Sequence, residues 1–279
     1  MSTTPASAPE AALLHLSDPH FGTERPQVVD ALLRWAAQHD AGVVVISGDI
    51  TQRARRGQFR RAQHFIERLR ARLPQATVLV LPGNHDIPLF NLPTRVLAPF
   101  AGFQRAFGPD LEPCHEDAAF QIQLVNTATP WLHTDGRVRR QQIERVAARL
   151  AQARAGQLRV VVTHQPAAVE RAEDEHDLLR GCDVALRRWA EAGADLLLGG
   201  HIHLPYVMAV RPGGEHGRRL WVVQAGTAVS SRIRNEANNS FNFIRYLPGV
   251  AGRVEVERWD YVELDDAFAL AGSSRLAFD

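Results

Sequence analysis

Short β-branched runs alternate with amphipathic helical patterns in the first half of the chain, and this order limits the fold more than any other feature. Runs at 12–16, 43–46 and 78–81 predict three strands. Between them, apolar residues recur with helical spacing over 28–36 and 59–73. A βαβαβ order predicts a parallel sheet with helices on its faces.

The second half of the chain is less regular. Prolines and glycines interrupt 91–117, which we interpret as an insertion of short helices. Further strands are predicted at 120–125, 160–163, 196–198, 206–210, 220–224, 241–247 and 254–259, with helices at 143–150 and near Trp189. The last four strands follow one another with only turns between them, so antiparallel pairing is expected there. We predict a single domain over 10–264, with its C-terminal sheet at 204–260, and loosely held ends at 1–9 and 265–279.

Potential metal ligands follow five of the predicted strands. They are Asp18 and His20; Asp49; Asn84, His85 and Asp86; His164; and His201 and His203. Ligands of open α/β sheets bind outside the carboxyl ends of the strands. The sequence therefore predicts that these side chains meet at one edge of the sheet.

This set of donors is larger than one ion requires. Seven of these nine residues, counted as four imidazoles, two carboxylates and one carboxamide, would give each of two ions four protein ligands, provided that one carboxylate bridges. Two ions about 3.5–4 Å apart can share a hydroxide and hold the oxygens around a phosphorus atom. Nitrogen and oxygen donors without thiolate favour two divalent or mixed-valence ions of Mn, Fe, Zn or Co.

The motifs DPH, GD, GNHD, HQP and GHIH, in this order, resemble those of the calcineurin-like metallophosphoesterase superfamily, and within it the bacterial class III cyclic nucleotide phosphodiesterases. They span Asp18 to His203, about two thirds of the chain. The resemblance implies an α/β fold of four layers, an αββα sandwich with mixed sheets and an antiparallel C-terminal part. It also implies hydrolysis of a phosphodiester by a metal-bridging hydroxide.

The resemblance assigns a role to each residue of the motifs. The first ion would be held by Asp18, His20, Asp49 and His203. The second would share Asp49 and be held by Asn84, His164 and His201. His85 would aid the leaving oxygen without binding metal, and Asp86 would orient His85. Many members of the family read His-His-Pro where this chain has Gln165, which leaves a substrate or outer contact in doubt there.

All 32 basic residues are arginine, and there are 12 histidines. The absence of lysine excludes Schiff-base and P-loop lysine chemistry and directs attention to imidazole. For substrate contact we select His133, together with Arg232 and Arg234 in the 226–239 loop. The arginines of 53–72 resemble a nucleic-acid stripe, but a net charge of +1 favours a solvated helix face, and nucleic acid is not the expected partner. A phosphate contact stays open for Arg53 and Arg55.

The expected substrate is a small phosphorylated molecule, first of all a cyclic nucleotide or similar diester. One alternative is pyrophosphate hydrolysis of a nucleotide-linked lipid precursor such as UDP-diacylglucosamine, which an acyl cleft of Leu97, Phe100, Phe103 and Phe107 would favour. A nuclease is a second alternative. A non-catalytic scaffold, similar to the retromer subunit of this fold, is a third.

The chain has two cysteines without CxxC spacing, and its N-terminus has no basic region before an apolar run. Both features predict a cytoplasmic protein. No stretch approaches about 20 apolar residues, the length of a membrane span. A homodimer is left open.

Overall fold

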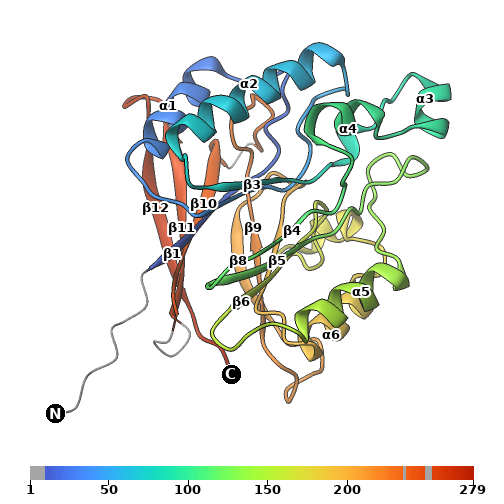
Figure 1. Ribbon diagram of the computed structural model, residues 1–279, viewed down its shortest axis with the longest axis vertical. Coiled ribbons are helices and arrows are strands. Elements are labelled where there is room, and N and C mark those ends of the chain that lie inside the picture. The colour runs from blue at the N-terminus through green and yellow to red at the C-terminus, as the bar shows by residue number, and fades with distance from the viewer. Residues whose placement is uncertain (1–9, 235–236, 249–252) are drawn as a thin grey trace.

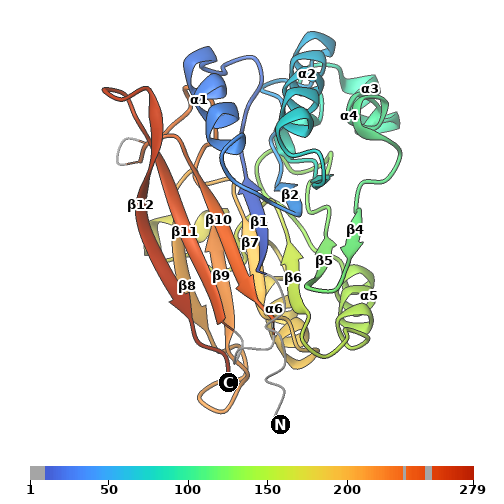
Figure 2. The same cartoon turned by 60° about the vertical axis from the view of Figure 1, so that its left-hand side comes forward.

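The structure is a computed structural model that describes residues 10–234, 237–248 and 253–279. Its strands form two mixed six-stranded sheets (Figures 1 and 2). The first has the order β12-β11-β10-β1-β2-β3. Its strands are β1 (Ala11–Leu16), β2 (Val43–Ile46), β3 (Thr77–Val80), β10 (Ser240–Leu247), β11 (Arg253–Val262) and β12 (Ala267–Leu276). Strands β1, β2 and β3 are parallel, as predicted, and β10 joins β1 in the antiparallel sense.

The second sheet has the order β4-β5-β6-β7-β9-β8. Its strands are β4 (Cys114–Glu116), β5 (Phe120–Leu124), β6 (Leu158–Val162), β7 (Leu196–Gly199), β8 (Tyr206–Val210) and β9 (Leu220–Gln224). Strands β5, β6, β7 and β9 are parallel, whereas β4 and β8 pair with their neighbours in the antiparallel sense. Both sheets are therefore mixed.

Helices cover the outer faces of the two sheets (Figure 1). The longer ones are α1 (Pro26–Ala36), α2 (Arg56–Arg72), α5 (Arg140–Leu150) and α6 (Cys182–Glu191). The shorter ones are the 3-10 helices η1 (Asn84–Asp86) and η2 (Ala172–Asp177), and the helices α3 (Leu92–Leu97) and α4 (Ala101–Phe107). Helices α3 and α4 occupy the segment expected to hold short helices. None of the helices in the described ranges is long and apolar enough to span a membrane.

The layering follows from the alternation of side chains along the strands. In β1, Leu13 faces the core between the sheets, whereas Leu14 faces the core beneath α1 and α2. In β2, Val43 and Val44 are divided in the same way. A third core lies between the second sheet and helices α5 and α6, where Trp189 is fully buried. Three cores between four layers make the predicted αββα sandwich.

Two expectations about the C-terminal part are wrong. The predicted loose tail at 265–279 contains β12, which pairs with β11 along its length. The C-terminal strands also do not form one sheet, because β8 and β9 extend the second sheet while β10–β12 extend the first. The first half and the C-terminal strands therefore share both sheets. The predicted flexible segment 1–9 lies outside the described residues.

Candidate metal centre

The loops at the strand ends bring the predicted ligands into two adjoining groups. In one, ligand atoms of Asp18, His20 and His203 lie within 4.8 Å of one another; in the other, those of Asp49, His164 and His201 do. The residues come from the ends of β1, β2, β6 and β7. The side chains do meet at strand ends, as predicted, but the strands belong to two sheets rather than to the single sheet that we expected.

Asp49 lies between these two groups. Its Oδ1 is 3.3 Å from Nε2 of His164, and its Oδ2 is 3.7 Å from Nε2 of His20. The backbone N–H of His85 also donates to Oδ1, at 2.8 Å. Burial acts to raise the pKa of Asp49, but the imidazoles of His164 and His85 outweigh it and hold the pKa well below its usual range. An ionised carboxylate with one oxygen toward each group has the geometry of a bridging ligand.

Asp18 is oriented by the protein through one oxygen only. Its Oδ2 accepts hydrogen bonds from Ser17 Oγ at 2.6 Å and from the backbone N–H of His201 at 2.9 Å. Its Oδ1 is buried without a hydrogen-bond donor and faces Nε2 of His203 at 3.2 Å. The side chain is therefore held with a free oxygen directed at the imidazoles.

His164 shows the same division between a supporting contact and a free donor atom. Its Nδ1 donates to the Ser47 carbonyl at 2.8 Å, and its Nε2 is buried without a hydrogen-bond partner. Burial acts to lower the pKa of His164, but the Asp49 carboxylate outweighs it and raises the pKa to about 9. This nitrogen is placed where a positive charge is stabilised.

The orphaned polar atoms test whether the site suits metal ions. Buried atoms without a partner include Asp18 Oδ1, Asn84 Oδ1, His164 Nε2 and His201 Nδ1. Leaving such atoms unpaired costs about 1–3 kcal/mol each, and all four belong to residues that the motifs assign as ligands. Neutral imidazole, carboxylate and carboxamide donors suit Mn, Fe, Zn or Co. The residues present therefore fit two such ions.

Backbone strain is concentrated at the same residues. Of the seven non-glycine residues with positive φ in the described chain, five are Asp18, His20, Asp49, His201 and His203. Left-handed backbone conformations are unfavourable for such side chains and persist where the surroundings enforce them. The fold thus holds these ligands in unfavourable conformations, as functional sites commonly do.

Gly200 lets the backbone pass close to Asp18, which gives a first prediction. A Cβ at this position would overlap Ser17 Oγ and Asp18 Oδ2. We expect Gly200→Ala to lower the free energy of unfolding by about 1–3 kcal/mol and to weaken metal binding, because Asp18 must move. Thermal unfolding with and without Mn²⁺ measures both effects. Gly57→Ala is the control, because no atom lies within 4 Å of that Cβ; equal stability of the two variants would contradict the prediction.

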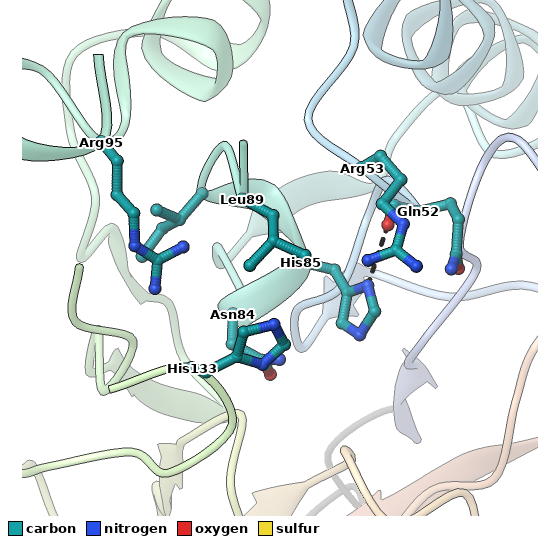
Figure 3. A pocket seen from close by; sticks show the side chains of 8 residues that line it. Gln52, Arg53, Asn84, His85, Leu89, Arg95 and His133 are labelled. Carbon is teal, nitrogen blue, oxygen red and sulfur yellow. Dashed lines mark hydrogen bonds between the residues drawn. The ribbon is translucent and has the colours of Figure 1, made fainter. Parts of the chain in front are cut away.

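His85 stands beside the ligand groups with its Nε2 directed into the site. Its Nδ1 donates to the Gln52 carbonyl at 2.9 Å (Figure 3). Its Nε2 lies 4.0 Å from Asp49 Oδ2. Arg232 Nη1 approaches the same Nε2 to 3.1 Å and donates to Gln52 Oε1 at 3.1 Å. Burial lowers the pKa of His85. Because Nδ1 is bonded to Gln52, Nε2 is the ring nitrogen that can exchange a proton with a group in the site once Arg232 moves from it.

Asp86 does not act on the His85 ring as we expected. Its carboxylate accepts hydrogen bonds from the backbone N–H groups of Gly83, Ile50 and Thr51 and from Thr51 Oγ1, at 2.8–3.0 Å. It is fully buried, and burial together with Asp49 raises its pKa to about 7. Asp86 thus joins the loops after β2 and β3, while Gln52 and Arg232 orient the ring.

The remaining predicted residues lie in different places. His133 lines a narrow hollow with His85, Asn84 and Arg95 (Figure 3). Arg232 reaches His85, whereas Arg234 forms ion pairs with Asp174 at 2.9 Å and Glu173 at 2.8 Å and so braces η2.

Gln165 is buried and supports the loop that carries His133. Its Oε1 accepts from Thr127 Oγ1 at 2.5 Å, and its Nε2 donates to the Thr134 carbonyl at 3.1 Å. In this structure Gln165 is therefore a support behind the site.

Three contributors to the site were missed or left without a role in the sequence. Asp177 Oδ1 lies 3.6 Å from Nε2 of His201 and orients that ring. Gln52 orients His85. Arg95 lines the hollow in front of His85, and its side chain is held there by hydrogen bonds that it donates to the carbonyls of Pro130 and Pro88. Gln52 lies in a loop, and Arg95 and Asp177 lie in the short helices α3 and η2, so none of the three stood in a motif or a long periodic segment.

A four-layer sandwich with Asp, Asn and His side chains gathered at its strand ends is the arrangement of a metal-dependent phosphoesterase. The family model described as calcineurin-like phosphoesterase matches residues 11–205, and the chain belongs to this family. Its members are generally metal-dependent hydrolases, and the His/Asp groups described above are compatible with that chemistry.

Solved structures share the fold at low sequence identity. The yellow lupin purple acid phosphatase PPD1 is 12% identical over 99% of this chain, with a TM-score of 0.69, and the chain spans 55% of its length. PhoD is 10% identical over 98% of this chain and 73% of its own, also with a TM-score of 0.69. Vps29 from Cryptosporidium parvum is 14% identical over 96% of this chain and 98% of its own, with a TM-score of 0.50. No curated protein matches the chain.

Proposed function

We propose that the chain hydrolyses phosphodiesters with two transition-metal ions, and that its substrate is a cyclic nucleotide or similar small diester. The observation that carries the proposal is the Asp49 carboxylate, which turns one oxygen to each ligand group while His85 Nε2 stands 4.0 Å from it. Asp18, His20, Asp49 and His203 would hold one ion. Asp49, Asn84, His164 and His201 would hold the other. Such ions supply positive charge at phosphate oxygens and a water of lowered pKa.

The protein's own groups have separate tasks in this proposal. Arg232, which lies against His85 and the Gln52 side chain, would turn toward a phosphate oxygen and bind it. Nδ1 of His85 is occupied by the Gln52 carbonyl, so Nε2 would take up the proton that the attacking water releases and give it to the leaving oxygen. His133 and Arg95 narrow the hollow in front of His85 and would limit the size of the group that enters.

The lipid-precursor alternative is weakened by the packing of the insertion. Phe103 is fully buried and packs with Phe107 in the core beneath α2, whereas Leu97 is 83% exposed. The apolar residues named for an acyl cleft therefore do not line one common surface. The scaffold alternative does not require the free, oriented donor atoms of Asp18 and His164.

The experiment is turnover of bis(p-nitrophenyl) phosphate by metal-free protein supplied with Mn²⁺, Fe²⁺, Zn²⁺ or Co²⁺. The proposal expects hydrolysis that depends on the added ion and exceeds that of p-nitrophenyl phosphate, a monoester. No turnover with any of the four ions would overturn the hydrolase. A faster monoester would overturn the preference for diesters. Cyclic AMP and single-stranded DNA, tested in parallel, separate the cyclic nucleotide from the nuclease alternative.

A further inference from the structure

An arginine-lined groove leads away from the hollow in front of His85. Two hollows of about 430 and 550 Å³ form it, over the start of α2, the segment before α3 and the helix α4. We call it the arginine groove, and its charged residues are Arg53, Arg55, Arg56, Arg60 and Arg105.

The groove adjoins the hollow in front of His85, which is itself lined by the candidate ligand Asn84. Arg53 and Leu89 line the hollow in front of His85 (Figure 3). The same two residues line the nearer part of the groove. Arg56 and Arg105 line both parts of the groove itself. A molecule with one phosphate at the ligand groups can therefore extend along the groove without leaving the surface.

The charge of the groove is not compensated locally. No Asp or Glu lines either hollow, and in the described part of the chain the five groove arginines form no ion pair. On the same helix α2, outside the groove, Arg61 pairs with Glu24 and Arg68 pairs with Asp30, both at 2.6 Å. Since the whole chain carries a net charge of only +1, this excess is local. Guanidinium groups free of carboxylate partners suit phosphate.

The groove also has an apolar side. Phe90 lines it and is 82% exposed, Leu89 adjoins it, and the ring of Phe59 lies along both parts. An exposed aromatic ring beside guanidinium groups offers a stacking surface for a planar organic group. The groove therefore suits a ligand that has both an organic body and negative charge.

We propose that the arginine groove binds a second phosphate of the substrate. The substrate would then be a diester whose organic part carries another phosphate, as in a phosphorylated nucleoside diester or a short oligonucleotide. The scissile phosphate would lie at the ligand groups, the organic part against Leu89 and Phe90, and the second phosphate among Arg55, Arg56 and Arg105. This inference rests on the proposed function.

The test compares two chromogenic diesters that differ only in the second phosphate. These are thymidine 5′-(p-nitrophenyl phosphate) and its 3′-phosphorylated form. We expect the 3′-phosphate to raise kcat/KM about 10-fold or more, mainly through KM, because hydrogen bonds between guanidinium and phosphate are charge-assisted and so stronger than neutral ones. The double variant R55Q/R105Q should lose this advantage. R72Q, an exposed arginine of α2 outside the groove, should keep it.

A binding measurement separates failure of the groove from failure of the hydrolase. Calorimetry compares thymidine 3′,5′-bisphosphate with thymidine 5′-monophosphate on Mn²⁺-containing protein, and it needs no turnover. A tighter bisphosphate, weakened by salt and by R55Q/R105Q but not by R72Q, supports the groove even if neither diester is hydrolysed. Equal affinities, unchanged in R55Q/R105Q, overturn it even if bis(p-nitrophenyl) phosphate is hydrolysed.

Further binding measurements identify which kind of molecule carries the second phosphate. Tetrathymidylate that binds more tightly than the bisphosphate, with a steeper salt dependence, would assign the groove to oligonucleotides. Similar affinities would assign it to a small bisphosphorylated substrate. Sedimentation with phosphatidylglycerol vesicles that R55Q/R105Q abolishes, without any preference for the bisphosphate, would overturn the proposal in favour of a membrane surface.

Discussion

His85→Asn is expected to lower kcat for diester hydrolysis by about 10²–10⁴-fold, the usual contribution of a positioned general acid. The reason is the position of Nε2, which stands beside Asp49 and Arg232 and can carry a proton to the leaving oxygen. Asparagine approximates the size of the ring but cannot transfer this proton. KM should change less than kcat, because His85 acts on the leaving group. Steady-state kinetics with bis(p-nitrophenyl) phosphate and Mn²⁺ measure the effect.

Metal content decides whether His85 acts as an acid or as a ligand. His85, His20 and Asp49 also lie close enough together to hold an ion, so elemental analysis of His85→Asn must accompany the kinetics. Two ions per chain with a low kcat support the acid. Loss of one ion would contradict it. His115→Asn is the matched control, because that histidine bonds to Asp117 away from the ligand groups, and it should keep full activity.

The alternation of β-branched runs with helical patterns along the chain predicted most of the fold. Strands β1 and β2 are short and apolar, and their side chains divide between two cores, so β-branched runs were sufficient to locate them. In β12 only Phe268 and Leu276 are buried, and Gly272, Ser273 and Ser274 have low strand propensity. An edge strand of this kind has no clear pattern, and its pairing with β11 depends on the rest of the sheet.

The candidate ligands could be selected from the sequence because each follows a strand within a few residues. A strand end limits where the next residues lie, so Asp18, Asp49 and His164 come into adjoining groups although they are far apart in the sequence. The residues that hold the His85 ring in place, Gln52 and Arg232, could not be found in this way. Arg232 is 147 positions from His85 and 180 from Gln52. Their contact forms only because the fold brings the 226–239 loop next to the loops that carry Gln52 and His85. Asp86 was misassigned for a related reason, since adjacency to His85 in sequence does not direct its side chain toward that ring.

Asp49→Asn should have the broadest effect of any substitution in the site, because Asp49 faces both ligand groups. A carboxamide keeps the size of the side chain and can accept from the His85 N–H, but it is uncharged and has a single oxygen. Loss of an outer partner of a ligand already costs about 10–100-fold in metal affinity, and loss of the shared ligand should cost more. We therefore expect fewer than two ions per chain and no measurable diester turnover.

Thermal unfolding isolates the metal-binding part of this prediction from catalysis. Mn²⁺ at 100 times its Kd stabilises a protein by about 2.7 kcal/mol for each site, so the unchanged chain should show a clear rise in Tm that Asp49→Asn loses. Without metal the variant should be less stable, because the imidazoles of His164 and His85 hold the pKa of Asp49 below its usual range, so its ionised carboxylate stabilises the folded chain. The rise in Tm on adding Mn²⁺ is therefore measured from each variant's own metal-free Tm. Asp30→Asn, which alters only an exposed pair with Arg68, should keep the full rise. Two ions and an unchanged rise in Asp49→Asn would show that Asp49 does not bridge, and the two ligand groups would then have to bind their ions independently.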